Sequence, residues 1–183
     1  MPKSNLYIGV LSGTSADSID ALLVDFSKSI KVIDRFSEKI PKKVKDNIFE
    51  LVLNKKLPNY TEKQKELDCK LGKLIGKCVN QLIKKSQVDK QTVKGIGSHG
   101  QTIIHSSSRK KPFSLQIGNP ELINKLTGIK VVHGFRQSDI ANGGMGAPLT
   151  PAFHKEYMSK ANINRAIVNI GGITNITLLP AKG

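Results

Sequence analysis

One polar turn between two apolar strands constrains the fold of this chain more than any other feature. Residues 5–11 and 19–26 are mostly apolar and read as strands, and the segment between them is rich in Ser, Gly, Thr and Asp. Gly13 has no Cβ to block a close approach, and such a turn gathers backbone N–H groups and hydroxyls. The turn therefore suits a polyphosphate, although the same residue types are also ordinary in a hairpin turn.

The pattern that follows this turn predicts an α/β protein. A third strand over 30–37 completes an antiparallel meander with the first two. Pro41 opens a helix that runs through Leu53, and a longer helix begins with Thr61 and Gln64 spaced as a capping box. The longer helix has apolar side chains at i, i+4, i+7 and i+8 and lysines on its other face, which is typical of a helix packed on a core.

The rest of the sequence predicts an alternation of short strands and helices. We expect strands at 93–97, 101–105, 113–117 and 129–133. An Asn-Pro pair at 119–120 and a Thr-Pro pair at 150–151 each provide an N-cap and a first-turn proline, which predicts helices up to about Leu126 and Lys160. From Ile167 to Leu179 the pattern predicts a closing hairpin with a Gly-Gly turn.

Composition and charge narrow the class of protein. The net charge of +15 favours acidic partners, but nearly all of it comes from lysines spread along the chain, without aromatic residues interleaved to stack on bases. Nucleic acid is therefore not the expected partner. The sequence has no apolar stretch of bilayer length and no apolar signal core at its N-terminus, which predicts a cytoplasmic protein without a membrane partner. Cys69 and Cys78 lie about 13 Å apart on one predicted helix, too far for a disulfide.

Glycines and polar side chains gather in four segments that a simple core does not explain. Glycines beside hydroxyls, amides and a guanidinium suit a phosphate or a polyhydroxylated ligand. The segments are Ser12–Asp20, Gly97–Thr102, the group formed by Leu115–Asn119, Phe135–Asp139 and Gly143–Pro148, and Asn169–Asn175.

On these motifs the chain closely resembles the anhydro-N-acetylmuramic acid kinases of the sugar kinase, hsp70 and actin superfamily. The resemblance implies a ribonuclease H-like (actin-like ATPase) domain with a mixed sheet and flanking helices. It also implies a transferase that uses ATP, water and Mg²⁺ to open 1,6-anhydro-N-acetylmuramic acid and to phosphorylate it on O6, in peptidoglycan recycling. The motifs occur in the family's order: Ser12–Ser15 with Asp17 and Asp20, Ser98–Thr102, Leu115–Gly118, Phe135 and Arg136 with Asp139, Gly143–Leu149, and Asn169–Ile173.

The resemblance further implies roles for individual residues. The ATP segment comprises Gly13, Thr14, Ser15, Ala16, Asp17, Ser18, Ile19 and Asp20, and Asp17 or Asp20 would meet Mg²⁺ directly or through water. The sugar-binding set comprises Ser98, His99, Gln101, Thr102, Gln116, Arg136 and Asp139, in which the planar fork of Arg136 suits a carboxylate. The alternatives are that each aspartate stabilises a turn, that His99 is a structural donor, and that Arg136 pairs with Asp139.

The sequence also departs from the family pattern. Ala16, Ser18, Gly134 and Met145 stand where the family usually has Leu, Gly, an acidic residue and Gln, and Asn119 stands where Asp is usual. Relatives are roughly twice as long, as two-domain proteins are. The family's catalytic base is expected in a segment beyond Gly183, so no catalytic residue is assigned.

We therefore expect residues 1–165 to form an N-terminal domain and residues 166–183 to form the first strands of a truncated second domain. The chain alone is expected to be inactive. Apart from the sugar, a separate C-terminal half and a homodimer are the partners left open. The other hypotheses are a catalytically silent sugar- or nucleotide-binding module and, less favoured, a basic nucleic-acid binder. Ile173, Ile176 and Leu178 are expected to be exposed and to promote self-association.

Overall fold

The computed structural model describes residues 5–106, 108, 110–170 and 174–181, and these divide into two compact units. Unit 1 comprises Met1–His105 and Ser114–Phe135, and unit 2 comprises Ser106–Phe113 and Arg136–Gly183. The expected division between 1–165 and 166–183 concerns the domains of the longer relatives and stays a prediction.

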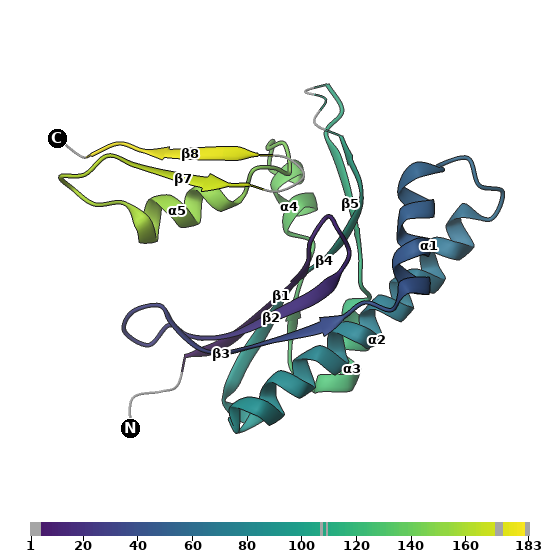
Figure 1. Cartoon of the computed structure of the whole chain (residues 1–183), viewed down its shortest axis with the longest axis horizontal. Coiled ribbons are helices and arrows are strands. Elements are labelled where there is room, and N and C mark those ends of the chain that lie inside the picture. Colours follow the sequence, from purple (N-terminus) through teal and green to yellow (C-terminus); the bar gives the residue numbers. More distant parts are fainter. Residues whose placement is uncertain (1–4, 107, 109, 171–173, 182–183) are drawn as a thin grey trace. The chain divides into compact units, whose positions relative to one another are not determined.

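A six-stranded mixed sheet forms the frame of unit 1 (Figure 1). Its order is β3-β2-β1-β4-β5, with β6 paired to β4. The pairs β1–β2 and β2–β3 are antiparallel, which confirms the predicted meander, whereas β1–β4 and β4–β6 are parallel. The strands are β1 (Leu6–Ser12), β2 (Ser18–Asp25), β3 (Lys31–Lys39), β4 (Val93–Ser106), β5 (Phe113–Ile117) and β6 (Val131–Val132).

One strand, β4, replaces the two that the sequence predicted at 93–97 and 101–105. Its register against β1 shifts at the step from Ser98 to Gly100, and Gly100 has a φ of 68°. A bulge with a glycine in the left-handed region bends a strand without ending it. The interval between the two predicted strands is thus a bulge, with His99 at its centre.

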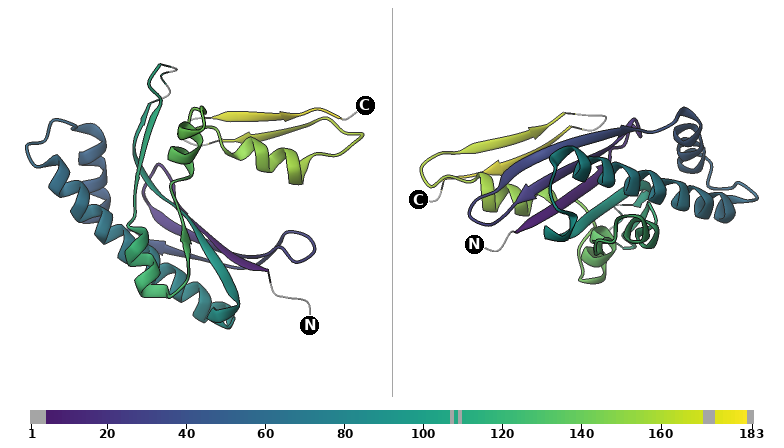
Figure 2. Two further views of the ribbon diagram at one scale, coloured as in Figure 1. Left: turned by 180° about the vertical axis from the view of Figure 1, so that it is seen from behind. Right: turned by 90° about the horizontal axis from the view of Figure 1, so that it is seen from below.

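Three helices belong to unit 1, namely α1 (Lys42–Leu53), α2 (Tyr60–Ser86) and α3 (Pro120–Thr127). Helix α2 packs against β1, β2 and β3, and both α1 and α3 contact α2 (Figure 2). The predicted apolar stripe of α2 is buried, including Leu67, Leu71, Ile75, Val79 and Leu82. Against it lie buried side chains of the sheet such as Ile8, Ile19, Leu23 and Ile96.

The predicted capping box of α2 is wrong. The helix begins at Tyr60, and its N-cap is Asn59, whose side chain makes no capping hydrogen bond. Because the helix begins one residue before Thr61, Thr61 lies inside the first turn. Tyr60 packs against the hydrophobic core at this end of the helix. At α3 the prediction is confirmed, because Asn119 is the N-cap and its side chain accepts from the Leu122 N–H.

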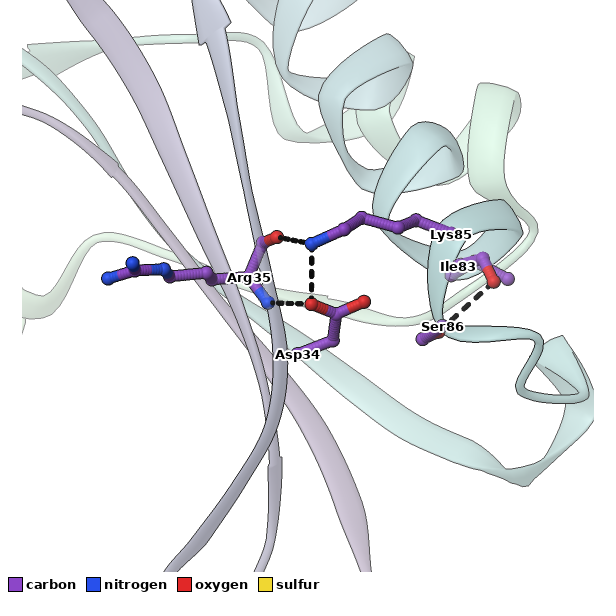
Figure 3. A network of polar contacts seen from close by, with 5 residues as sticks. All are labelled: Asp34, Arg35, Ile83, Lys85 and Ser86. Carbon is purple, nitrogen blue, oxygen red and sulfur yellow. Dashed lines mark hydrogen bonds and ion pairs between the residues drawn. The ribbon is translucent and has the colours of Figure 1, made fainter.

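Polar contacts attach the end of α2 to strand β3 (Figure 3). Lys85 Nζ donates to Asp34 Oδ1 at 2.7 Å and to the Arg35 carbonyl at 2.9 Å. The hydrogen bond from Lys85 lowers the pKa of Asp34, with a smaller contribution from the Arg35 N–H. Since the side chain of Lys85 is about half exposed, these contacts fix the register of the helix on the sheet more than they add stability.

Unit 2 contains α4 (Phe135–Ala141, which begins at the last residue of unit 1), α5 (Thr150–Met158), β7 (Arg165–Asn169) and β8 (Asn175–Leu179). The closing hairpin is confirmed, since β7 and β8 pair antiparallel, while its Gly-Gly turn lies outside the described residues. Helix α4 was not predicted. At α5 the N-cap is Leu149, so Thr150 lies within the helix instead of capping it.

The hairpin of unit 2 has one covered and one open face. Helix α5 contacts β8, and His154 Nδ1 lies 3.0 Å from the Thr177 hydroxyl. On the other face, Val168 pairs with Ile176 and Ala166 pairs with Leu178, and all four are exposed. The predicted exposure of Ile176 and Leu178 is confirmed, whereas Ile173 lies outside the described residues. None of the helices in the described part of the chain is long and apolar enough to cross a membrane.

Candidate functional site

The turn between β1 and β2 presents exposed backbone donors. Ala16 donates its N–H to the Gly13 carbonyl at 3.0 Å and has a fully buried side chain with a φ of 48°. Gly13, Thr14 and Ser15 are exposed. In the part of the chain that the structure describes, the N–H groups of Thr14 and Ser15 donate to no protein atom. Two adjacent amides at the tip of a tight turn can bind an anion.

The two aspartates of this turn have different partners. Asp17 forms an ion pair with Lys45 of α1, and its backbone carbonyl accepts from the Ile40 N–H at 2.9 Å. Hydrogen bonds from Lys45 and from the Ser15 hydroxyl lower the pKa of Asp17. Asp20 accepts instead from two hydroxyls, Ser18 Oγ at 3.1 Å and Ser37 Oγ. The charge of Asp17 is thus balanced by a lysine, whereas the two hydroxyls that donate to Asp20 are uncharged.

A buried hydrogen bond connects this turn to the β4 bulge. Ser12 Oγ donates to Gln101 Oε1 at 2.7 Å, and Gln101 is 3% exposed. Its amide nitrogen donates to the Thr102 carbonyl at 3.3 Å. The structure therefore brings together two segments that are 89 residues apart in the sequence, and it uses Gln101 as their connector.

The other predicted sugar-binding residues of unit 1 lie on β4 and β5. Gln116 Nε2 donates to Thr102 Oγ1 at 3.1 Å and to Ser114 Oγ at 2.8 Å. His99 Nδ1 lies 3.1 Å from the Gly100 carbonyl. Thr102, Gln116 and His99 are partly exposed, while Ser98 and Gln101 are buried. The first three can therefore reach a ligand from this surface more directly than the last two.

Asp68 of α2 holds the corner between β5 and α3, a role that the sequence did not reveal. Its Oδ1 accepts from the Gly118 N–H at 2.8 Å and its Oδ2 accepts from Asn119 Nδ2 at 2.9 Å. Asp68 lies among lysines and glutamates on α2, so its sequence context resembles a solvated helix face. Lys45 was missed for the same reason, because a lysine in a lysine-rich helix carries no distinctive signal.

In unit 2, Arg136 and Asp139 both bind Gly146. Arg136 Nη1 donates to the Gly146 carbonyl at 2.7 Å, and the Gly146 N–H donates to Asp139 Oδ2 at 2.7 Å. Burial lowers the pKa of Arg136, but a guanidinium remains charged at neutral pH. The two predicted residues thus shape one loop, and the planar guanidinium of Arg136 is of a type suited to a carboxylate.

The described residues offer no preformed metal centre, and one of the two thiols is buried. Among them, no three His, Cys, Asp or Glu side chains are grouped so as to hold a metal ion. Cys78 is buried against the sheet with its Sγ 3.5 Å from the Ile19 carbonyl, and burial raises its pKa to about 11. Cys69 is an exposed free thiol.

The antiparallel meander, the parallel strand β4 and the helix layer on one face define a ribonuclease H-like domain. This architecture is that of the class of sugar kinases and actin-like ATPases.

Comparison with known proteins gives the family. Residues 5–183 match the model of the family described as anhydro-N-acetylmuramic acid kinase, and the chain belongs to this family. Relatives named anhydro-N-acetylmuramic acid kinase from Coxiella burnetii (strain Dugway 5J108-111) and Shewanella woodyi are each 46% identical over 98% of this chain. The matches cover 47% and 48% of those proteins, so the chain spans about half the length of the curated relatives it matches.

Proposed function

We propose that this chain supplies the N-terminal half of an ATP-dependent kinase acting on 1,6-anhydro-N-acetylmuramic acid. In the proposed reaction water adds to C1 as the C1–O6 bond of the anhydro ring breaks, and O6 takes the γ-phosphoryl group of ATP with release of ADP. The product is N-acetylmuramic acid 6-phosphate, for peptidoglycan recycling in the cytoplasm. Membership of the family supports the reaction class. The observation that carries the proposal is the pair of exposed amides, Thr14 and Ser15, that donate to no described protein atom.

The turn fits the terminal phosphates of ATP. Gly13 leaves room at the tip, since a Cβ built there meets nothing within 4 Å, and the Thr14 and Ser15 N–H groups can donate to phosphate oxygens. The proposed nucleotide segment continues through Ala16 and Ser18–Asp20, with Asp17 and Asp20 as candidates to meet Mg²⁺. Bound Mg²⁺ would offset the charge that develops on the transferred phosphoryl group.

The sugar is proposed to bind along the β4 bulge and its neighbours. Thr102 and Gln116 form a partly exposed hydrogen-bonded pair suited to sugar hydroxyls, and His99 lies on the same bulge. Ser98 and Gln101 support these residues from buried positions. Arg136, held at Gly146 together with Asp139, is proposed to meet the lactyl carboxylate of the muramic acid.

No residue of this sequence is assigned as the catalytic base. Turnover is proposed to need the segment that corresponds to the other half of the relatives, because a kinase of this class closes two domains around its nucleotide. A separately supplied C-terminal half is therefore the main protein partner, and a homodimer is the alternative.

Titration calorimetry with Mg-ATP tests the nucleotide site. Wild type and Ser15→Ala, which keeps the backbone N–H, are expected to bind. Ser15→Pro removes that donor and should weaken binding by about 10- to 100-fold, the usual effect of one hydrogen bond to a charged group. Circular dichroism checks that both variants are folded. Equal binding by all three proteins would refute the site.

A second experiment separates a kinase half from a catalytically silent binding module. The chain is mixed with the C-terminal half of the Coxiella burnetii relative, and sugar phosphorylation is measured with and without ATP. Turnover in the mixture alone supports the kinase. Binding of the anhydro sugar and Mg-ATP without turnover supports the silent module.

A further inference from the structure

We propose that Lys45 of α1 braces the nucleotide turn by holding Asp17, and that Asp17 is therefore a positioning residue and not a ligand of the nucleotide's cation. This inference rests on the proposed function, because it concerns the same turn. It separates the roles of two aspartates that the sequence could not distinguish.

Lys45 is held next to Asp17 by its packing on α1. Lys45 Nζ forms an ion pair with Asp17 Oδ1 and lies 5.7 Å from the centroid of the Phe49 ring. The Lys45 side chain is only 32% exposed, against 65% for Asp17. A lysine that packs along an aromatic ring on its own helix has less freedom to leave its partner than an ordinary surface lysine.

Backbone contacts connect the same turn to the start of α1. The Asp17 carbonyl accepts from the N–H of Ile40, which is buried, and the neighbouring Ala16 side chain is fully buried. The second half of the turn is thus fixed by the Ile40 hydrogen bond, by the burial of Ala16 and by Lys45. Thr14 and Ser15 lie directly before these fixed points, so the brace holds their exposed amides in one orientation.

Asp20 differs from Asp17 in the charge of the groups that donate to it. Its carboxylate accepts from the Ser18 and Ser37 hydroxyls, which carry no charge. A neutral donor orients a carboxylate but leaves its negative charge, whereas the ammonium of Lys45 cancels the charge of Asp17. Lys39 adds further positive potential at Asp17. A hydrated Mg²⁺ carried by ATP would therefore be attracted to Asp20 and repelled from the surroundings of Asp17.

Amide exchange of the free chain tests the brace without any ligand. The probes are the hydrogen-bonded N–H groups of Ala16 and Ile40, followed by NMR. Lys45→Gln and Asp17→Asn should each speed their exchange by about two- to five-fold, and the double variant should add nothing. Lys45→Arg should restore slow exchange. Lys42→Gln, on the same helix but paired with Asp46, is the matched control and should have no effect.

Binding of ATP at varied Mg²⁺ tests the role of Asp17. If Lys45 braces the turn through Asp17, Lys45→Gln and Asp17→Asn weaken ATP binding to a similar extent. Both variants then leave the Mg²⁺ concentration for half-maximal binding unchanged. If Asp17 were a metal ligand, Lys45→Gln would free it and lower that concentration, whereas Asp17→Asn would raise it. Such opposite shifts would overturn the inference.

The two experiments also separate this inference from the proposed function. Failure of the wild type to bind ATP would refute the nucleotide site, while the exchange rates would still decide whether Lys45 braces the turn. Unchanged exchange in Lys45→Gln would refute the brace even if ATP binds.

Discussion

Asn119→Asp should destabilise this chain strongly, because it places a second carboxylate against Asp68. Asn119 Nδ2 donates to Asp68 Oδ2 at 2.9 Å, and the Gly118 N–H occupies the other oxygen of Asp68. The substitution replaces the donor with an acceptor while keeping the oxygen that caps α3. Its effect therefore reports the Asp68 contact and not the loss of the cap.

The size of the effect follows from the geometry. Two unit charges 2.9 Å apart repel by about 6 kcal/mol at an effective dielectric constant of about 20. Side-chain movement and water relieve part of this repulsion, and one hydrogen bond of about 1 kcal/mol is lost as well. We expect the free energy of unfolding to fall by about 2–4 kcal/mol at pH 7.

The loss of unfolding free energy caused by Asn119→Asp should grow as the pH rises. Repulsion raises the pKa of the carboxyl pair in the folded state above the unfolded value of about 3.9. The variant is therefore least impaired at and below about pH 4, where one protonated carboxyl can donate to the other, and it loses stability as the pH rises through the folded pKa.

Urea denaturation followed by circular dichroism at pH 4 and pH 7 measures this deficit. Asn119→Ser, which keeps a capping oxygen but adds no charge, is the control. An Asn119→Asp variant as stable as Asn119→Ser at pH 7 would show that Asp68 does not hold this corner.

Three other results are expected. Gly100→Ala should lower the free energy of unfolding by about 3 kcal/mol in thermal denaturation, because its Cβ would lie 2.4 Å from a backbone carbonyl oxygen and its φ is +68°; a loss below about 1 kcal/mol would contradict the bulge. At pH 8 a thiol reagent should label one cysteine of the native chain, the exposed Cys69, since burial keeps Cys78 protonated with a pKa of about 11; rapid labelling of both would be inconsistent with this packing. Ile176→Lys with Leu178→Lys should reduce self-association in sedimentation velocity, because both side chains are exposed on β8; an unchanged distribution would exclude this face.

Periodic patterns in the sequence were sufficient to predict the main layers of unit 1. The alternation over β1, β2 and β3 predicted the meander, and the apolar stripe of α2 predicted the helix that covers it. These predictions were correct because burial of one face is a local, repeating requirement that each element carries in its own residues.

The helix starts were harder to predict. Asn119 was recognised as a cap, but Thr61 and Thr150 fit the same rule and lie inside their helices. Which residue begins a helix depends on the tertiary contacts of its first turn as well as on its capping potential. Helix α4 escaped prediction because its seven residues have no buried member and so no apolar period.

The class of the fold, the family and the segment that contains the candidate phosphate site could all be predicted from the order of the residues. The folded chain was needed to see which side chains meet across that frame: Ser12 with Gln101, Asp68 with Asn119, and Lys45 with Asp17. These contacts could not be predicted because a hydrogen bond or ion pair between distant segments leaves no period in either one. Its partners become visible only when packing of the apolar faces has fixed the distance between them.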